Sequence, residues 1–283
     1  MRYGLNLLLW TDTLYDGILP VLEQIKRIGY DAVEIPIFEL DIDKHCQWGR
    51  RLNDLGLART AVTIRTVDDN PISPDAAVRK LGVANTCKAL DCAAAAGCET
   101  LVGPFHSALG YFSGAGPTAD EWKWGVESMR QVAEHAEKCN VTLGVEYLNR
   151  FECYFLNTAA DGARFCHDVD HPRCQMMYDT FHSNIEEKST SAAIRAVSGC
   201  LSHVHISEND RSTPGQGGIR WAEAFDTLHE IGYNNLLVIE AFGLALDKIA
   251  AATKIWRRMY TSEIQLAKDG LQFMKQQVAM RWK

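Results

Sequence analysis

Helix-like segments of this chain repeatedly end at a glycine or asparagine that is followed at once by an extended apolar run. Glycine and asparagine are favoured in the left-handed conformation just past a helix, so each of these residues marks a helix that leads into a strand. Regular alternation of helix and strand is typical of an α/β protein with a parallel sheet. The six junction residues are Gly29, Gly56, Gly97, Asn140, Gly199 and Gly232.

The apolar runs predict eight strands that alternate with helices along the chain. Eight such units in 283 residues, close to the ~250 typical of a (β/α)8 barrel, favour a closed barrel over an open sheet. No low-complexity linker divides the sequence, so we expect a single TIM barrel domain over residues 1–283, with an extra C-terminal helix at about 262–280. Residues 246–280 are expected to be largely helical, with a break near 261–262. The strands are expected near residues 3–10, 30–36, 58–64, 99–104, 141–146, 175–179, 201–206 and 236–240.

The composition narrows the classes of function. Hydrophobic residues make up 47% of the chain and charged residues 23%, which is ordinary for a globular protein with a sizeable core. The net charge of −7 disfavours a surface that follows nucleic-acid phosphates, because such a surface needs clustered lysine and arginine. No apolar run reaches the ~18 residues of a membrane-spanning helix, and the glycine-rich loops match no nucleotide-binding fingerprint. We expect a small neutral substrate, no nucleotide cofactor, no nucleic-acid partner and no membrane association.

The cysteines indicate the redox environment. There are nine, an odd number, scattered singly and without Cys-x-x-Cys spacing. This pattern indicates reduced thiols in a cytoplasmic protein rather than a disulfide framework or a zinc site. The apolar run at the N-terminus has no small-residue cleavage site after it, so we interpret it as a first strand and expect a cytoplasmic location.

Four later strands end in side chains of the metal-binding type. Glu146 follows the apolar run 141–145, where a charge is costly unless it is paired. Asp179, His205 and Glu240 end the next three runs in the same way. The carboxyl ends of barrel strands meet on the face where barrel enzymes place their chemistry. One such residue alone can be a core ion pair or a hydrogen-bonded histidine, but four aimed at one point would repel one another without a cation among them.

The donor types and their positions suggest a chemistry. Three carboxylates and one imidazole suit Mn²⁺, Mg²⁺ or Co²⁺ better than a thiolate-rich zinc site does. The strands that carry Glu146 and Glu240 are three steps apart around an eight-stranded barrel, or roughly 135°. The two carboxylates would thus face each other across a bound substrate, where one can remove a proton from carbon and the other can return one to the opposite face. The sequence therefore predicts inversion at a carbon.

Four motifs surround these side chains. They are Glu146-Tyr-Leu-Asn-Arg-Phe-Glu152, then Asp179-Thr-Phe-His182 with Asn184-Ile-Glu-Glu187, then His203-Val-His205 with Glu208 and Arg211, then Ile239-Glu240-Ala-Phe242. In this order they resemble the ketose 3-epimerases, a group of xylose-isomerase-like barrels that includes the D-tagatose, D-allulose and L-ribulose 3-epimerases. The resemblance extends over essentially the whole chain and is sharpest from 141 to 242. It implies one divalent ion, Mn²⁺ as first choice and Co²⁺ or Mg²⁺ as alternatives, and it implies that two of the ligands also form the acid/base pair. The implied ligands are Glu146, Asp179, His205 and Glu240, with the two glutamates as the pair.

By the same resemblance, Glu152, His182 and Arg211 would hydrogen-bond the substrate oxygens near C1 to C3. The chemistry is consistent, since His182 and Arg211 are donors suited to an enediolate oxygen, and Glu152 can orient a hydroxyl. Each has a structural alternative: an ion pair for Glu152 and Arg211, and loop packing for His182.

Aromatic residues are candidates for the wall of the substrate pocket. Phe242 follows the last predicted ligand by two residues and is expected to line the pocket, with core packing as the alternative. Trp10, His106, Phe112 and Trp122 are weaker candidates for the same wall or for a lid.

Three residues of the motifs have no role in this scheme. His203 lies one inward position below His205 by strand alternation, so we expect it in the core or supporting a ligand. Asn149 and Arg150 are expected to hold their loop in place.

We therefore expect an isomerase, a carbohydrate 3-epimerase that acts at C3 of a free 2-ketose with the help of a metal ion. Either Glu146 or Glu240 would remove the C3 proton to give a cis-enediolate, and the other would protonate the opposite face. We also expect a homodimer or homotetramer.

Three other functions are weighed against this one. An aldose–ketose isomerase or an inosose dehydratase would use the same ion at a different carbon. A DNA-repair endonuclease of this barrel type would gather several zinc ions with additional histidines, and the acidic balance of the chain disfavours it. A non-catalytic sugar- or metal-binding barrel would have no need of the carboxylate pair.

Overall fold

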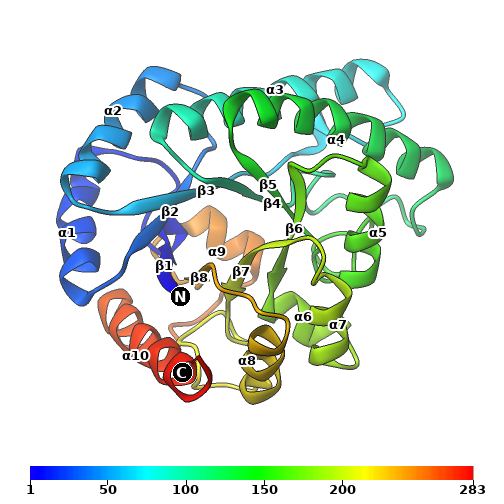
Figure 1. Ribbon diagram of the computed structural model, residues 1–283. Coiled ribbons are helices and arrows are strands. Elements are labelled where there is room, and N and C mark those ends of the chain that lie inside the picture. Colours follow the sequence, from blue (N-terminus) through cyan, green and yellow to red (C-terminus); the bar gives the residue numbers. More distant parts are fainter. Residues whose placement is uncertain (283) are drawn as a thin grey trace.

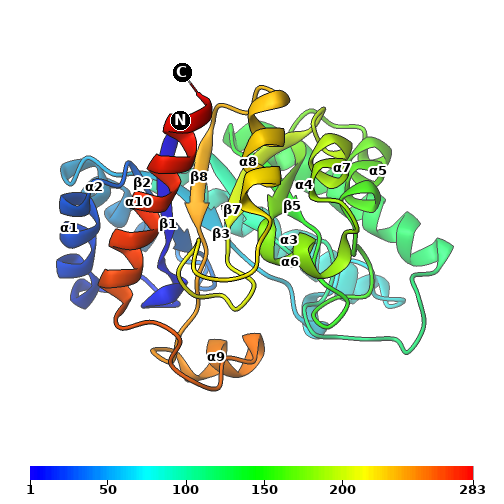
Figure 2. The ribbon, with the colours of Figure 1, turned by 90° about the horizontal axis from the view of Figure 1, so that it is seen from below.

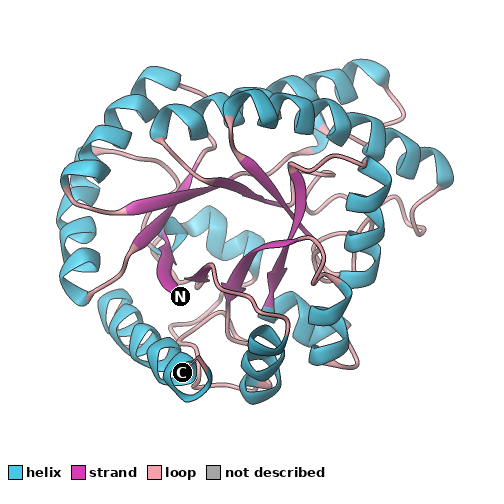
Figure 3. Ribbon diagram, in the orientation of Figure 1, coloured by secondary structure: helices cyan, strands magenta, loops and turns pink. Residues whose placement is uncertain are grey.

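All eight predicted strands form in the computed structural model, which describes residues 1–282, and they close into one parallel barrel. Each strand pairs with the next along the chain, and β8 pairs with β1. Figure 3 shows the strands as an inner ring with helices outside it, which confirms the predicted (β/α)8 TIM barrel. The strands are β1 (Arg2–Asn6), β2 (Ala32–Pro36), β3 (Ala58–Val62), β4 (Thr100–Gly103), β5 (Thr142–Glu146), β6 (Cys174–Asp179), β7 (Leu201–Ile206) and β8 (Leu236–Ile239).

The helices form the outer wall, as Figure 1 shows. Within residues 1–282, seven of the ten α-helices begin with a side-chain cap, and at the start of α4 the side chains of Thr118 and Glu121 form a reciprocal capping box. The α-helices are α1 (Leu19–Ile28), α2 (Ile42–Asp54), α3 (Ala76–Ala96), α4 (Ala119–Cys139), α5 (Ala159–Val169), α6 (Thr180–Glu186), α7 (Thr190–Ala196), α8 (Trp221–Glu230), α9 (Asp247–Thr253) and α10 (Glu263–Arg281).

Five of the six predicted helix-to-strand junctions have a left-handed residue. The φ angles are 108° at Gly29, 65° at Gly56, 76° at Gly97, 53° at Asn140 and 71° at Gly232. The sixth prediction, for Gly199, is wrong: α7 already ends at Ala196, and a turn then leads to β7 without a left-handed glycine. Helix α7 has only seven residues, and four residues separate its end at Ala196 from the start of β7 at Leu201.

The first strand is shorter than predicted. β1 ends at Asn6, and Leu7–Leu9 form a 3₁₀ turn instead of continuing the strand. The Asn6 side chain accepts a hydrogen bond from the Leu8 backbone N–H at 2.8 Å and so caps this turn. A local cap therefore outweighs the strand preference of an apolar run.

The break between the two C-terminal helices is longer than predicted. Helix α9 ends at Thr253, before Lys254 with a φ of 62°, and α10 begins only at Glu263. Figure 2 shows α9 beyond the arrowhead of β8, where it covers one end of the barrel instead of its side. The predicted C-terminal helix is present as α10, which packs against α1 and α8 and closes the ring of helices.

Burial separates two regions with different chemistry. The large apolar core lies between the strands and the helices. The interior of the barrel instead contains completely or almost completely buried polar side chains, among them Asn6, Glu34, Thr60, His203 and His205. Buried polar groups are stable only when they are paired, so their contacts determine what this interior can do.

Candidate active site

The structure brings the four predicted metal-type side chains together. Glu146 and Asp179 are the last residues of β5 and β6, His205 is the last but one of β7, and Glu240 directly follows β8. All four are buried, and one ligand atom from each lies within 4.8 Å of the others. Their convergence follows from the parallel barrel, because the carboxyl ends of its strands share one face.

Two of these side chains are held so that one atom of each faces the centre of the cluster. Asp179 caps α6 through Oδ1, which accepts from the Phe181 backbone N–H at 2.6 Å. Its Oδ2 is thereby directed at Nδ1 of His205, 3.6 Å away. Nδ1 also lies 3.5 Å from Oε1 of Glu240, yet it makes no hydrogen bond to any described residue. A buried ring nitrogen among carboxylate oxygens without a hydrogen bond is what a metal-ligating histidine presents.

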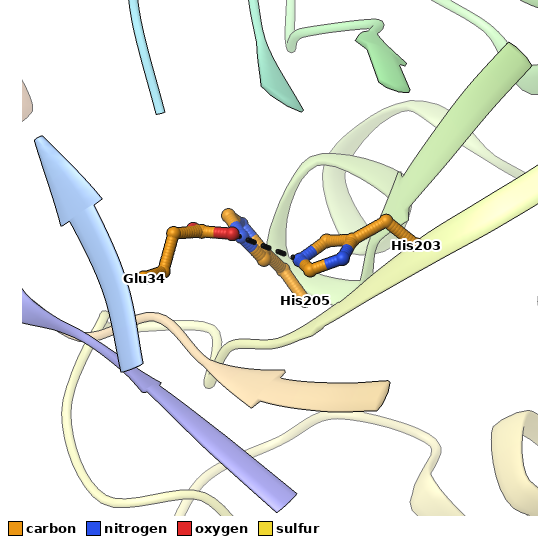
Figure 4. A group of neighbouring side chains, drawn as sticks. All are labelled: Glu34, His203 and His205. Atoms are coloured by element: carbon orange, nitrogen blue, oxygen red, sulfur yellow. Dashed lines mark hydrogen bonds and ion pairs between the residues drawn. The ribbon is translucent and has the colours of Figure 1, made fainter. Parts of the chain in front are cut away.

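Glu34 of β2 is the residue that the sequence reasoning missed. Figure 4 shows its carboxylate pointing towards the rings of His203 and His205, which both come from β7. Oε1 lies 2.7 Å from Nε2 of His205, and Oε2 lies 3.0 Å from Nε2 of His203. Because an ionised carboxylate can only accept, Nε2 of His205 carries a proton towards Glu34, and Nδ1 is the ring nitrogen that faces the cluster.

The remaining hydrogen-bonding capacity of Glu34 is also used. The Asn6 amide donates to Oε1 at 2.9 Å, and the Thr60 hydroxyl donates to Oε2 at 2.8 Å. Glu34 stands in the apolar strand Ala32–Pro36. A charged residue inside such a strand is the same signal that identified Glu146, and it would have identified Glu34 too.

The electrostatics of the cluster favour a positive charge. Burial acts to raise the pKa of Glu34, but the charges of His205 and His203 outweigh it and hold that pKa well below its usual range. Burial acts to lower the pKa of His205, yet the charges of Glu34 and Glu240 raise it well above its usual range. Burial, together with the charge of Glu240, raises the pKa of Glu146. In the absence of a cation, His205 itself thus takes up a positive charge, and three carboxylates with one imidazole fit a divalent cation of the Mn²⁺, Mg²⁺ or Co²⁺ type that would replace the proton on Nδ1.

Arg211 places a guanidinium group next to the cluster. Its backbone has a φ of 61°, a conformation rarely adopted by residues other than glycine, which is a form of strain often found at functional sites. Its Nη1 donates to Oδ2 of Asp179 at 3.0 Å and to Glu240. The guanidinium lies between two aromatic rings, 3.8 Å from the centre of Phe181 and 5.0 Å from that of Phe242. Stacking between two rings holds the Arg211 guanidinium in one orientation.

Asn149 orients two of the predicted substrate contacts. Its backbone N–H donates to Nδ1 of His182 at 3.0 Å, and its side-chain amide donates to Glu152 at 2.8 Å. Nδ1 of His182 is thus an acceptor, so its Nε2 carries the proton and points into the site, 3.4 Å from Glu146. Burial, with the charge of Arg211, lowers the pKa of His182 to about 3, so the ring is neutral. Burial raises the pKa of Glu152.

Two further charged residues hold the loops around the site. The Arg150 guanidinium makes a two-pronged ion pair with Glu186 of α6, with the shortest contact at 2.8 Å. Glu208 is completely buried and accepts from the backbone of Gly215 at 2.8 Å and from the indole of Trp221 at 3.0 Å. The buried Glu208 carboxylate therefore holds the loop that carries Arg211 in place.

A pocket of about 320 Å³ opens beside the cluster. Its size is that of a small-molecule site. Five of the predicted site residues line it together with Phe242, and α9 contributes Lys248 and Ile249 to its edge. The six predicted residues in its lining are Glu146, Glu152, His182, Arg211, Glu240 and Phe242.

The weaker wall candidates lie elsewhere. Trp10, His106, Phe112 and Trp122 are not part of the pocket lining. His106 is completely buried, and its Nε2 donates to the Glu146 backbone carbonyl at 2.8 Å, while the Ser107 hydroxyl donates to its Nδ1 at 3.0 Å. His106 therefore holds the backbone at the end of β5 in place through its hydrogen bond to the Glu146 carbonyl. Among residues 1–282, no helix is long and apolar enough to cross a membrane.

Comparison with known proteins gives the class of protein first. The chain matches the family model described as xylose isomerase-like TIM barrel over residues 22–277. This agrees with the closed parallel barrel and with the polar cluster at the carboxyl ends of its strands.

Curated and solved relatives narrow this class. A D-psicose 3-epimerase of Ruminiclostridium cellulolyticum is 33% identical over 95% of this chain and 96% of its own length. An L-ribulose 3-epimerase of Mesorhizobium japonicum is 32% identical over 96% of this chain and 93% of its own. The crystal structure of a D-allulose 3-epimerase from Methylomonas sp. in complex with D-allulose superposes with a TM-score of 0.92 at 27% identity, covering 98% of this chain and 97% of that one. The chain belongs to the ketose 3-epimerase family and is a carbohydrate 3-epimerase.

Proposed function

We propose that this protein epimerises a free 2-ketose at C3 by a two-base mechanism through a cis-enediolate. The observation that carries the proposal is the buried pair of Glu146 and Glu240, which approach one another beside the pocket in a chain of this family. The relatives act on D-psicose and L-ribulose by their names. A ketose of five or six carbons is accordingly the substrate class that we propose.

The ligands that we propose for the ion are Glu146, Asp179, His205 and Glu240, with Mn²⁺ as first choice. When bound, a divalent ion supplies Lewis-acid polarisation of the substrate carbonyl, which makes the neighbouring C–H more acidic. Nδ1 of His205, which lies among carboxylate oxygens without a hydrogen bond to any described residue, supports this assignment.

The proton steps belong to the two glutamates. One carboxylate takes the C3 proton, and the C3–H electron pair moves into the C2–C3 bond while the C2 carbonyl oxygen gains negative charge. The other carboxyl group then gives a proton to the opposite face of C3, which inverts that centre.

Two donors are aimed at the oxygens that gain charge. The protonated Nε2 of His182 and the guanidinium of Arg211 lie 3.0 Å apart at the edge of the pocket. The two groups contact each other directly, and because both line the pocket, each can also offer an N–H to a substrate oxygen that gains negative charge. We propose that they stabilise the enediolate, while Glu152 accepts a hydrogen bond from a substrate hydroxyl.

Glu34 has a positioning role in this proposal. It holds the proton of His205 on Nε2, and it does so without touching the pocket. Phe242 forms part of the pocket wall and also stacks against Arg211, so it would fix both the substrate and one of its donors.

The test is isotopic. The metal-loaded protein is incubated with a panel of 2-ketoses in deuterated water, and the position of the deuterium is determined by NMR. We expect deuterium at C3 together with the C3 epimer. Deuterium at C1 or C2 would assign the site to an aldose–ketose isomerase instead, and binding without any exchange would indicate a sugar-binding barrel.

Assembly as a homodimer or homotetramer and a cytoplasmic location are also proposals. All nine cysteines are free, which supports a reducing compartment. Light scattering of the purified protein would test the assembly, and cell fractionation would test the location.

A further inference from the structure

A second cluster of metal-type side chains lies on the outer wall of the barrel. Asp91 belongs to α3, while His135 and Cys139 belong to α4, and these two helices pack side by side (Figure 1). One ligand atom from each of the three lies within 4.8 Å of the others. None of them lines the catalytic pocket.

The distances are close to those of a tetrahedral metal site. Cys139 Sγ lies 3.5 Å from Oδ1 of Asp91, and Nε2 of His135 lies 2.7 Å from the same oxygen. Ligand atoms held at 2.0–2.3 Å from a tetrahedral zinc ion are about 3.3 to 3.6 Å apart. The distance from Cys139 Sγ to Asp91 Oδ1 already has this length. The distance from His135 Nε2 to the same oxygen would have to increase by about 0.6 Å. The His135 and Asp91 side chains are 30% and 37% exposed, so core packing does not oppose this shift.

The local structure favours a cation at this place. His135 and Cys139 are four residues apart, so they share one face of α4. Cys139 is the last residue of that helix, where free backbone carbonyls favour positive charge. Asp91 faces them from α3 with a full negative charge.

We propose that Asp91, His135 and Cys139 bind one Zn²⁺ ion, with the fourth position open to solvent. A thiolate, an imidazole and a carboxylate are the mixed donors that zinc accepts, whereas the catalytic cluster is rich in oxygen and lacks sulfur. An ion at this site links α3 to α4 and stabilises the folded barrel, because it binds the native pair of helices and not the unfolded chain. The site is independent of the epimerase reaction.

Co²⁺ can serve as the probe because it absorbs light and replaces zinc. The metal-free full-length protein, kept reduced, is titrated with Co²⁺ and observed in the near ultraviolet, where only a thiolate ligand gives a charge-transfer band. We expect the wild-type protein to bind two ions and to show this band. The Cys139→Ser variant should bind one ion and lose the band. Cys174→Ser is the matched control, because it removes a buried thiol near Cys166 and should leave the band intact.

The same variants separate this proposal from the epimerase function. We expect Cys139→Ser to keep full turnover with Mn²⁺, and we expect Zn²⁺ to abolish the Co²⁺ band and to raise the melting temperature of the wild type more than that of Cys139→Ser, which keeps only the catalytic ion. A wild-type protein that binds a single Co²⁺ without the band would overturn the proposal. So would a band that survives Cys139→Ser and disappears in Cys174→Ser.

Discussion

Glu34 places a carboxylate oxygen 2.7 Å from Nε2 of His205, and this contact determines which ring nitrogen faces Asp179 and Glu240. The two residues are 171 positions apart in the chain, and they meet because β2 and β7 both point their side chains into the barrel. The buried network around Glu34 therefore lies beneath the proposed metal site and supports it.

Exchange of Glu34 for Gln tests this support. The amide cannot accept from His205, Asn6 and Thr60 as a carboxylate does, and it lacks the charge that faces His203, so the orientation of His205 is loosened. We expect the Mn²⁺ affinity to fall roughly 10- to 100-fold, as measured by titration of the metal-free protein. Glu39→Gln is the control, since Glu39 pairs with Lys44 at the surface. An unchanged affinity in Glu34→Gln would show that Glu34 serves the core alone.

Exchange of Asn149 for Ser tests the orientation of His182 and Glu152. Serine keeps the backbone N–H that bonds to His182 but loses the amide, which holds Glu152 and also contacts Nδ1 of His182 at 2.9 Å. We expect kcat to fall on the order of 100-fold, because a displaced substrate contact no longer matches the transition state. The ¹⁵N shifts of His182 should still report a proton on Nε2. A normal kcat in Asn149→Ser would mean that Glu152 needs no such anchor.

His106 predicts part of the acid sensitivity of the fold. Burial lowers its pKa from 6.5 to about 4. Above pH 6.5 the ring is neutral in both the folded and the unfolded chain, so protonation of His106 does not change the free energy of unfolding there. As the pH falls from 6.5 towards 4, the unfolded chain takes up a proton that the native state does not, and the free energy of unfolding falls by roughly 3 kcal/mol.

The measurement is urea unfolding at several pH values. His106→Gln should keep a donor to the Glu146 carbonyl but show a smaller loss of stability between pH 6.5 and 4 than the wild type. The control is His167→Gln, because the His167 side chain is 89% exposed. Equal pH slopes for wild type and His106→Gln would contradict a neutral, buried His106.

Helix α9 is expected to contribute to substrate selection. Ile249 lines the pocket from this helix, across from the catalytic cluster. We expect Ile249→Ala to raise KM about 10-fold with a smaller effect on kcat, because removing apolar contact weakens binding of the substrate and the transition state alike. The kinetics of the preferred ketose and its C3 epimer provide the measurement. Lys254→Ala, at the end of α9 and outside the pocket lining, is the control, and equal effects of both variants would refute the role of Ile249.

The sequence predicted the barrel well because strand and helix signals repeat in each unit. The four ligand-type residues were predictable for the same reason, since strand ends on one face must converge. Glu34 was overlooked because it stands within its strand instead of at the end, although its charge in an apolar run was visible. Helix α9 could not be placed, because helical periodicity does not reveal whether a helix lies against the wall or across the mouth of a barrel. The role of Asn149 depends on a contact with His182, 33 residues away, which no local pattern encodes.

The pairing of Glu146 with Glu240 is the central claim, and exchange of Glu240 for Gln tests it most directly. The variant is loaded with Mn²⁺, metal occupancy is measured, and each C3 epimer of the substrate is incubated separately in deuterated water. With the metal bound, we predict that no C3 epimer is formed from either side and that at most one of the two epimers takes up deuterium at C3, because only Glu146 remains to exchange a proton on its own face. Continued epimerisation at C3 by the metal-loaded Glu240→Gln protein would contradict the two-base account.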